Sequence, residues 1–511
     1  MFKSNKIENM YLKYLITVSL FTFCLNAFSN LNRVVQIDPI IGFNGSFFTQ
    51  SHQTSTLKDT KGINTVISVK TDKSTFLYGS KATRIVGELK KQGGDYFEWK
   101  GNGEMSWAIN VPTVEKYDLF LIADVPEDSK NIEMLFTSGT SSYKFTINPT
   151  VGPWVGGGKN FQRIKVLFDV SLPKGNQEVV LNTSGIITNN TLLNIRSIEL
   201  VPVSAYKSIQ KEEKHAITSR ASTEWLTKTG YGLMFHWTSQ SVNPDGSNKP
   251  YEQAVNDFDV KKFAKMVEET GAGYVIFTIG HAEPYCPAPI KNWEKYHPGK
   301  TTKRDLIAEI SDQLKTKNIR MICYLPTHVV AKYQKANDNE FMKINIEVLQ
   351  EMGERYKDKI AGYWFDGWYQ CFEEYPDVSF KSFFEATKAG NKDRIVALNS
   401  WIYPPVTPWQ EFWAGEVASP VAIPENGFMN DGPVPNLQYQ ALLIMEPYWV
   451  QEKAEMPEPR FTSSQLSQYI KDCMKNQGAV TINMGIYQDG TVGEKALKVM
   501  KEVRNQIRTD K

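Results

Sequence analysis

The stretch that decides the fold is Ile360-Ala361-Gly362-Tyr363-Trp364-Phe365-Asp366-Gly367-Trp368. It is a short apolar run that ends in a carboxylate, and apolar runs of this length next to a glycine are typical of buried strands. A charged carboxylate at the end of such a strand is costly unless it is paired or has a function. In a barrel of parallel strands, active sites lie at the carboxyl ends of the strands. Asp366 is therefore either the cap of the next helix or part of an active site.

The composition describes a soluble globular protein with more than one core. A chain of 511 residues favours two domains. The 58 basic and 56 acidic residues nearly balance, so we do not expect nucleic acid or an anionic membrane surface as the partner. The 12 tryptophans suit a carbohydrate ligand, whose apolar C–H faces pack against aromatic rings, although β-rich domains also accumulate tryptophan.

Residues 1–29 have the pattern of a secretory signal peptide. Lysines precede an apolar stretch from Leu15 to Leu25, and Ala27-Phe28-Ser29 provides a cleavage site with small residues. The apolar stretch is shorter than the roughly 20 residues of a membrane span. We therefore expect a secreted or periplasmic protein that is not inserted in the membrane after cleavage near Ser29; retention of the segment as an anchor is the alternative.

Four cysteines follow the signal peptide, at positions 286, 323, 371 and 473. Their spacing matches neither a zinc site nor a dense disulfide framework. Two disulfides would be compatible with an oxidising compartment, but buried free thiols are favoured.

Residues 35–205 have the pattern of an all-β sandwich. Short alternating runs separated by turn residues occur at 95–99, 105–111, 117–122, 163–168, 178–181 and 195–200. Such alternation with frequent turn signals predicts an antiparallel, jelly-roll-like sandwich. Residues 206–221 are rich in Lys and Glu and are predicted to be a linker or a linking helix.

Residues 222–511 repeat a strand-then-helix pattern of the α/β class. Strands are predicted at 231–237, 274–280, 320–326, 360–366, 394–399, 411–416, 441–447 and 479–485. Helices are predicted at 259–270, 305–317, 340–356, 380–388, 463–475 and 494–507. Eight strands over this length fit a (β/α)8 TIM-like barrel, which typically takes about 250 residues. A doubly wound open sheet is the alternative, but no Gly-rich phosphate loop follows the first strand.

Polar residues recur at the predicted strand ends, which a barrel would bring to one cavity. In chain order they are His236, His281 with Glu283, His328, Asp366, Asn399, Glu416, Glu446 and Asn483. The chain has only 6 histidines, and three of them fall at consecutive strand ends, which favours binding of substrate hydroxyl groups over a structural role. Nearby tryptophans could stack on sugar rings, although each one alone is better explained as core: Trp364, Trp368, Trp401 and Trp413.

Paired carboxylates beside neutral hydroxyl-binding groups are typical of glycoside hydrolysis. One carboxylate attacks the anomeric carbon while a protonated one assists the leaving oxygen. Histidines and carboxylates also bind zinc, but no two histidines here have a His-x-x-x-His spacing. We expect an oligosaccharide or polysaccharide substrate, no metal and no other cofactor. Metal-dependent hydrolysis or deacetylation, and sugar binding without efficient catalysis, are the alternatives.

The barrel residues resemble glycoside hydrolase family 29, the α-L-fucosidases, over residues 222–505. Four segments carry the resemblance: 231–237, which ends in His236-Trp237; 271–281, which ends in His281; Trp364-Phe365-Asp366-Gly367; and 476–491 with Asn483. They are specific only when taken together and in order. The sandwich resembles, more weakly, the jelly-roll carbohydrate-binding modules of families 6 and 35, at 95–99, 107–111 and 172–181.

The resemblance implies a retaining mechanism. It makes Asp366 the nucleophile and favours Glu416 as the acid/base, with Glu283 and Glu446 as rivals. Taken together, the strand ends, the nearby tryptophans and the matched motifs predict these substrate-binding residues: His236, Trp237, His281, Glu283, His328, Trp364, Asn399 and Trp413.

Two positions depart from the family pattern. Ala282 stands where the family has a second adjacent histidine, and Asn399-Ser400 stands where it has an arginine. Because both positions help to recognise the sugar, α-L-fucosyl, α-L-galactosyl and sulfated fucan linkages all stay open as substrates.

Overall fold

The computed structural model describes residues 66–93, 95–150, 159–183, 190–332, 337–429 and 434–508. All of them belong to the unit Gln53–Lys511. The predicted signal peptide lies outside the described residues. Within the described ranges, no helix has both the length and the apolar character that a bilayer span requires.

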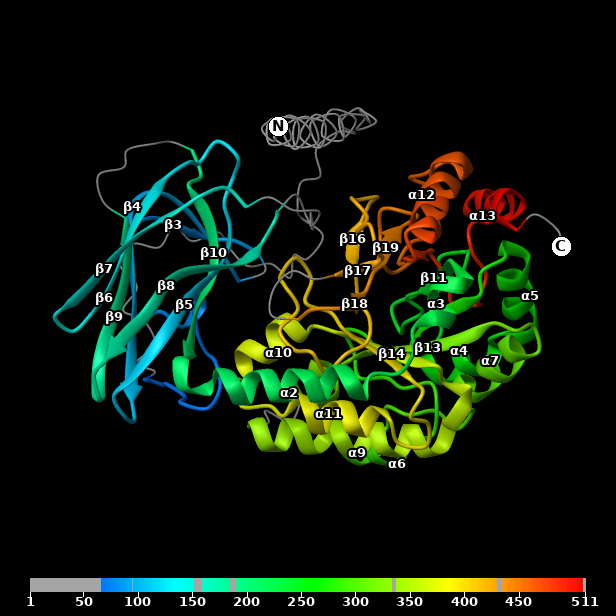
Figure 1. Ribbon diagram of the computed structural model, residues 1–511. Coiled ribbons are helices and arrows are strands. Elements are labelled where there is room, and N and C mark those ends of the chain that lie inside the picture. The colour runs from blue at the N-terminus through cyan, green and yellow to red at the C-terminus, as the bar shows by residue number, and fades with distance from the viewer. Residues whose placement is uncertain are drawn as a thin grey trace, which may run out of the picture. The chain divides into compact units, whose positions relative to one another are not determined.

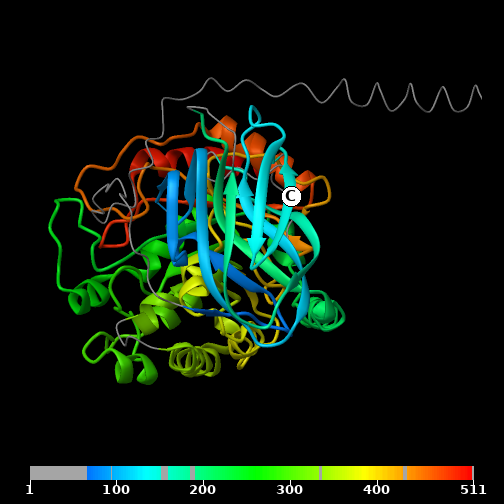
Figure 2. The same cartoon turned by 90° about the vertical axis from the view of Figure 1, so that its left-hand side faces the viewer.

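The N-terminal part is a sheet of ten strands, which confirms a sheet-rich region before the α/β part (Figure 1). The strands are β1 (Ile67–Ser68), β2 (Thr75–Tyr78), β3 (Arg84–Lys91), β4 (Phe97–Val111), β5 (Glu115–Asp124), β6 (Ile132–Ser138), β7 (Ser141–Ile147), β8 (Gln162–Leu172), β9 (Gly175–Thr183) and β10 (Leu193–Pro202). The main order is β7-β6-β9-β4-β10-β5-β8, with β1 and β3 paired to β4 and β2 paired to β10. Figure 2 views these strands after a quarter turn.

Alternation along β4 explains how this sheet forms its core. Trp99, Met105, Trp107 and Ile109 are fully buried, and all have odd numbers. Successive side chains of a strand point to opposite faces, so one face of β4 packs inward while the other carries the more polar residues between them.

The next segment is helical. It contains the short 3-10 helix η2 (Val203–Ala205), α2 (Tyr206–Ser219) and α3 (Glu224–Thr229), so the range predicted as a linker or linking helix folds largely as α2. The other 3-10 helices are η1 (Gly79–Lys81) and η3 (Lys357–Lys359).

The second sheet has eight strands in the order β15-β14-β13-β12-β11-β20-β19-β16. Their bounds are β11 (Tyr231–Phe235), β12 (Tyr274–Thr278), β13 (Arg320–Pro326), β14 (Gly362–Asp366), β15 (Ile395–Leu398), β16 (Glu416–Ala418), β19 (Gln440–Ile444) and β20 (Ala479–Asn483). Every pair in this ladder is parallel. Since β15 and β16 form the two edges, the strand pairing gives a near-barrel rather than a closed one. The parallel arrangement brings the carboxyl ends of the strands to one rim.

The sixth strand lies later in the chain than the predicted 411–416. The backbone of Glu411 instead hydrogen bonds to Val396 of β15 on one side and to Gln438 on the other. Gly415 then takes a left-handed φ of 60°, which interrupts the extended chain before Glu416. The two-stranded hairpin β17 (Phe428–Met429) and β18 (Leu437–Gln438) follows, and the described residues between β15 and β19 contain no helix.

The remaining helices lie in the α/β part, in the segments that follow β11, β12, β13, β14, β19 and β20 (Figure 1). They are α4 (Tyr251–Asp257), α5 (Val260–Thr270), α6 (Lys291–Tyr296), α7 (Leu306–Lys315), α8 (Thr327–Lys332), α9 (Asp338–Tyr356), α10 (Trp368–Glu374), α11 (Phe380–Thr387), α12 (Ser463–Lys475) and α13 (Glu494–Ile507). Side chains cap several of them: Asp259 caps α5, Asp305 caps α7, and Thr462 forms a capping box with Gln465 on α12.

The four cysteines at positions 286, 323, 371 and 473 are free and buried. This confirms the preference for buried thiols over disulfides.

Candidate active site

Asp366 is the last residue of β14 and accepts three hydrogen bonds. The hydroxyl of Tyr324 donates to Oδ2 at 2.5 Å, and Oδ1 receives the amide of Asn399 at 2.9 Å and the backbone N–H of Gly367 at 2.8 Å. Helix α10 begins after Gly367 without a side-chain cap, so Asp366 is not the cap of that helix. Burial raises the pKa of Asp366, and the hydrogen bonds from Tyr324 and Asn399 lower it. The lowering effects prevail, so the pKa lies below the ordinary value of an aspartate.

Asn399 joins two carboxylates. It follows β15, and its Nδ2 donates to Asp366 at 2.9 Å and to Oε2 of Glu416 at 2.6 Å. Its Oδ1 accepts the backbone N–H of Trp401 at 2.9 Å, which fixes the orientation of the amide. Because both carboxylate oxygens bond to one nitrogen, they lie at most about 5.5 Å apart, within the separation typical of retaining glycosidases.

Glu416 is the first residue of β16, and its pKa is shifted in the opposite direction to that of Asp366. Burial and the negative charge of Asp366 raise the pKa of Glu416 to about 8, although the bond from Asn399 opposes this. Both carboxylates keep some exposed surface. The opposite shifts favour one ionised carboxylate and one carboxylic acid in the pair at neutral pH.

Two neutral histidines lie beside this pair. The Nδ1 of His236 hydrogen bonds with Oδ1 of Asn483 at 2.7 Å, and burial with the neighbouring His281 lowers the pKa of His236 to about 3. The rings of His236 and His281 meet edge to face at 5.5 Å. Burial also lowers the pKa of His281, and its Nδ1 has no hydrogen-bond partner among the described residues. Neutral imidazoles with a vacant nitrogen can bind hydroxyl groups.

The sequence model of the alpha-L-fucosidase family matches residues 250–509, which is half of the chain. The chain belongs to the alpha-L-fucosidase family. This confirms the resemblance to family 29 and places the protein among the glycoside hydrolases by family.

Curated relatives of this fucosidase-family protein are distant. Tissue alpha-L-fucosidase of Rattus norvegicus is 22% identical over 227 residues, which cover 36% of this chain and 48% of the relative. Alpha-L-fucosidase of Dictyostelium discoideum is 23% identical over 204 residues, covering 34% and 43%. The chain thus spans about half the length of the curated relatives it matches. Among solved structures, alpha-L-fucosidase isoenzyme 1 from Paenibacillus thiaminolyticus is 17% identical, with a TM-score of 0.43, and the match covers 56% of this chain and 75% of that one.

The fucosidase-family protein brings most of the predicted polar residues together. Asp366, Glu416 and Asn399 form the bonded group, and His236 and His281 lie next to each other. His328 belongs to α8 and faces Gly367, since a Cβ at that glycine would come within 2.3 Å of its Nδ1. These contacts place the side chains; their roles in substrate binding stay predictions.

Three predicted tryptophans are instead buried in the fold. Trp237 donates to the carbonyl of Gln488 at 3.0 Å, and Trp364 donates to that of Ala414 at 3.1 Å. Trp413 packs against Tyr439, with ring centroids 5.7 Å apart. In these positions they can support the site but offer little surface to a sugar.

The two rival glutamates hydrogen bond to residues outside the bonded group. Glu283 is exposed and accepts the hydroxyl of Ser239 at 2.5 Å. Glu446 is buried and accepts the N–H of Gly485 at 2.8 Å, and burial raises its pKa to about 7. Within the described part of the chain, no hydrogen bond or ion pair joins either glutamate to Asp366.

Sequence reasoning missed three aromatic residues at the site. Tyr324 is the donor to Asp366, and Trp449 lies 5.1 Å from the ring of His236. The pKa of Tyr369 is raised by burial and then by the charges of Asp366 and Glu416. The parallel register sets Pro326 of β13 opposite Asp366. Tyr324 therefore lies two residues before the position opposite Asp366, on the same face of the sheet. This two-residue spacing was the signal available in the sequence.

A metal site does not emerge from the described residues. No group of three or more His, Cys, Asp or Glu side chains among them is arranged to hold an ion.

Proposed function

We propose that this protein is a retaining glycoside hydrolase that cleaves α-L-fucosyl linkages of an oligosaccharide or polysaccharide. The observation that carries the proposal is the single amide of Asn399 that binds both Asp366 and Glu416. The two carboxylates have opposite pKa shifts and a short separation, as a double displacement requires.

In this mechanism, Asp366 attacks the anomeric carbon while Glu416 gives its proton to the leaving oxygen. The C–O bond to the leaving group breaks as the ester bond to Asp366 forms. Glu416, now ionised, then takes a proton from water, and the resulting oxygen attacks the same carbon and releases Asp366. The bonds from Tyr324 and Asn399 hold the attacking carboxylate in its ionised state.

The neutral histidines suit the hydroxyl groups of the sugar. His236 is oriented by Asn483, and the vacant Nδ1 of His281 can accept or donate one bond. A site that hydrogen bonds a hydroxyl group discriminates strongly against sugars without it. Because the family resemblance implies an arginine where this chain has Asn399, α-L-galactosides and sulfated fucans should be compared with α-L-fucosides.

We further infer that the near-barrel is a (β/α)8 barrel. In this barrel, residues 411–413 take the place of the sixth strand and close the sheet next to β15. The support is that Glu411 and Trp413 hydrogen bond across the interval from β15 to Gln438, next to β19. We also propose that the described strands within the predicted range 35–205 form a jelly-roll-like sandwich, and that 222–511 is the catalytic domain.

The decisive experiment uses an aryl α-L-fucoside with an activated leaving group. We expect Asp366→Gly to lose turnover and to regain it with azide, giving the β-fucosyl azide, because azide fills the space of the missing carboxylate. NMR of the first product formed by the wild type should show the α anomer. A β anomer as first product, or full activity of Asp366→Asn, would exclude this mechanism.

A second series assigns the acid/base. Glu416→Ala should impair poor leaving groups far more than activated ones, because only poor leaving groups need the proton. Glu446→Gln and Glu283→Gln are matched controls. For these variants, the ratio of kcat/KM between a fucoside with an activated leaving group and one with a poor leaving group should equal that of the wild type. Full activity after exhaustive chelation is expected, whereas loss that returns with added metal would favour metal-dependent hydrolysis.

A further inference from the structure

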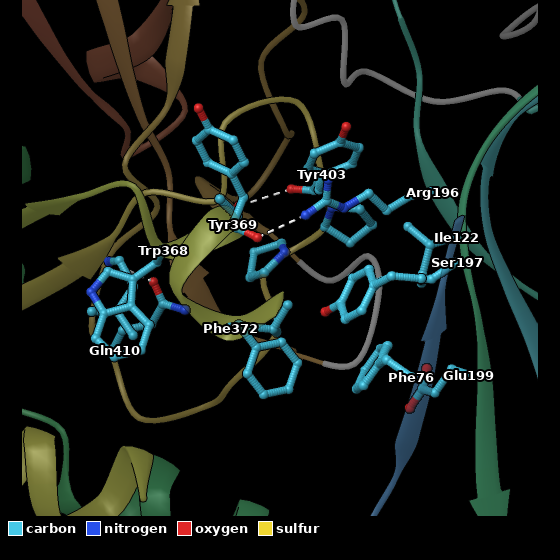
Figure 3. Close-up of a pocket in the computed structure, with 16 residues that line it drawn as sticks. Phe76, Ile122, Arg196, Ser197, Glu199, Trp368, Tyr369, Phe372, Tyr403 and Gln410 are labelled. Carbon is cyan, nitrogen blue, oxygen red and sulfur yellow. Dashed lines mark hydrogen bonds between the residues drawn. The ribbon is translucent and has the colours of Figure 1, made fainter. Parts of the chain in front are cut away.

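Arg196 lies on β10 of the N-terminal sheet, and its guanidinium group is bound to α10. The side chain is only 3% exposed. Its Nη2 donates to the backbone carbonyl of Tyr369 at 2.8 Å and forms an ion pair with Glu373 at 2.6 Å, while Nη1 donates to the carbonyl of Asp95 at 3.1 Å. Figure 3 shows the guanidinium reaching from β10 toward Tyr369. A buried charge persists only where such partners compensate it.

In the α/β part, Arg196 contacts the segments that follow β14 and β15, two of the strands that carry the candidate active site. Helix α10 begins directly after Asp366-Gly367, at the end of β14. The guanidinium also lies 4.5 Å from the ring centroid of Tyr403, in the loop that follows Asn399. One side chain of the N-terminal sheet thus contacts the chain just beyond the proposed nucleophile and just beyond its bridging amide.

Aromatic contacts continue from these segments to the carboxylates. The ring of Tyr369 lies 5.5 Å from that of Trp401 and 6.2 Å from that of Tyr403. Trp401 in turn supplies the N–H that orients Asn399. A shift of α10 would therefore move Tyr369, and through Trp401 it would disturb the amide that holds both carboxylates.

Side chains only partly enclose this face of α10. A pocket lies beside it, lined among others by Phe76 of β2 and Phe372 of α10 (Figure 3), whose ring centroids are 5.1 Å apart. The hydrogen bonds and ion pair of Arg196 therefore act together with this ring contact to place α10.

We propose that Arg196 is a positioning residue for the reaction proposed above. It holds α10 and the loop after β15, and so keeps Asp366, Asn399 and Glu416 in register. The N-terminal sheet is then part of the catalytic apparatus and is more than an appended binding module. This inference rests on the proposed function, because its first test measures kcat on an α-L-fucoside.

The test compares Arg196→Met, Arg196→Lys and Arg196→Gly in the full chain, with Arg163→Met as the matched control. Arg163 is an ion-paired arginine of the same sheet, bound to Glu199 at 2.5 Å. For Arg196→Met we expect kcat on the aryl α-L-fucoside to fall about 10- to 100-fold, the loss that small misplacement of reacting groups produces. Arg196→Lys should recover part of the rate, and millimolar guanidinium should raise the kcat of Arg196→Gly but not that of Arg163→Met. A kcat of Arg196→Met within twofold of the control would overturn the proposal.

A second measurement does not depend on turnover. Backbone hydrogen exchange of residues 368–374 and 400–403 should be faster in Arg196→Met than in Arg163→Met, by about tenfold or more, because local opening becomes easier when these bonds are lost. Equal exchange in the two variants would refute the positioning role. A wild type that turns over no tested glycoside would instead refute the proposed function, and the exchange result would still decide the role of Arg196.

Discussion

The hydroxyl of Tyr324 donates a 2.5 Å hydrogen bond to Oδ2 of Asp366. We predict that Tyr324→Phe lowers kcat/KM about 10- to 150-fold, because a hydrogen bond to a charged group is worth about 1.5–3 kcal/mol. The ring should stay in place, since it stacks on Trp364 at 5.3 Å. Tyr363→Phe is the matched control: that hydroxyl is buried, has no partner among the described residues, and its loss should leave kcat/KM unchanged. Equal effects of the two variants would contradict the role given to Tyr324.

The pH profile of kcat/KM should have a broad plateau that ends near pH 8. The reaction needs Asp366 ionised and Glu416 protonated, and the pKa of Glu416 is raised to about 8 by burial and by Asp366. Activity therefore falls as pH rises through that value, while the acid limb lies below the ordinary pKa of an aspartate.

Substitution identifies the group behind the alkaline limb. With an activated aryl fucoside, Glu416→Gln should abolish this limb, and Glu446→Gln should leave it in place. The opposite pattern would make Glu446 the acid/base, which its own pKa of about 7 would allow.

Gly367→Ala should reduce activity through steric contact as well as backbone strain. Gly367 has a φ of 74°, and an added Cβ would lie 2.3 Å from Nδ1 of His328. Gly299 has the same φ of 74°, but a Cβ added there would have no atom within 4 Å. Gly299→Ala should cost about 1 kcal/mol of unfolding free energy with unchanged kcat, whereas Gly367→Ala should also lower kcat/KM at least tenfold. If both variants keep the wild-type kcat, the contact with His328 is irrelevant to catalysis.

Lys388→Met should strongly destabilise the α/β part. Lys388 pairs with the fully buried Glu411 at 2.6 Å, and Glu411 also accepts the N–H groups of Val396 and Ala221. Removing the cation leaves a buried carboxylate uncompensated, which costs about 3–5 kcal/mol in urea-induced unfolding. Lys381→Met, which breaks an exposed pair with Glu385, should cost less than about 0.5 kcal/mol. A loss for Lys388→Met as small as that of this control would show that Glu411 is neutral or solvated in the folded protein.

The strands that were predicted well are those whose apolar runs are uninterrupted. β13 has the predicted bounds, Arg320–Pro326, and β14 ends at Asp366 as expected. β16 was misplaced because Glu411 to Trp413 have a strand-like composition but bond to two different neighbours. These hydrogen bonds depend on which strands become neighbours when the sheet curves round, and local sequence does not encode that.

The candidate site was predictable where one rule applied, namely that polar residues at strand ends converge. That rule identified Asp366, Asn399 and Glu416, which the structure joins through one amide. It did not separate Trp364, which is core, from Trp449, which lies by His236. Arg196 carried no local signal at all, because its partners on α10 lie more than 170 positions later in the chain.

The burial of every described thiol has a practical consequence for handling this protein. Burial raises the pKa of Cys286, Cys323, Cys371 and Cys473, so none forms the reactive thiolate at neutral pH while the fold is closed. Alkylating or disulfide-exchanging reagents can modify these side chains only after the surrounding core opens. The sulfhydryl groups thus act as internal probes, whose rate of labelling measures how often the α/β part unfolds.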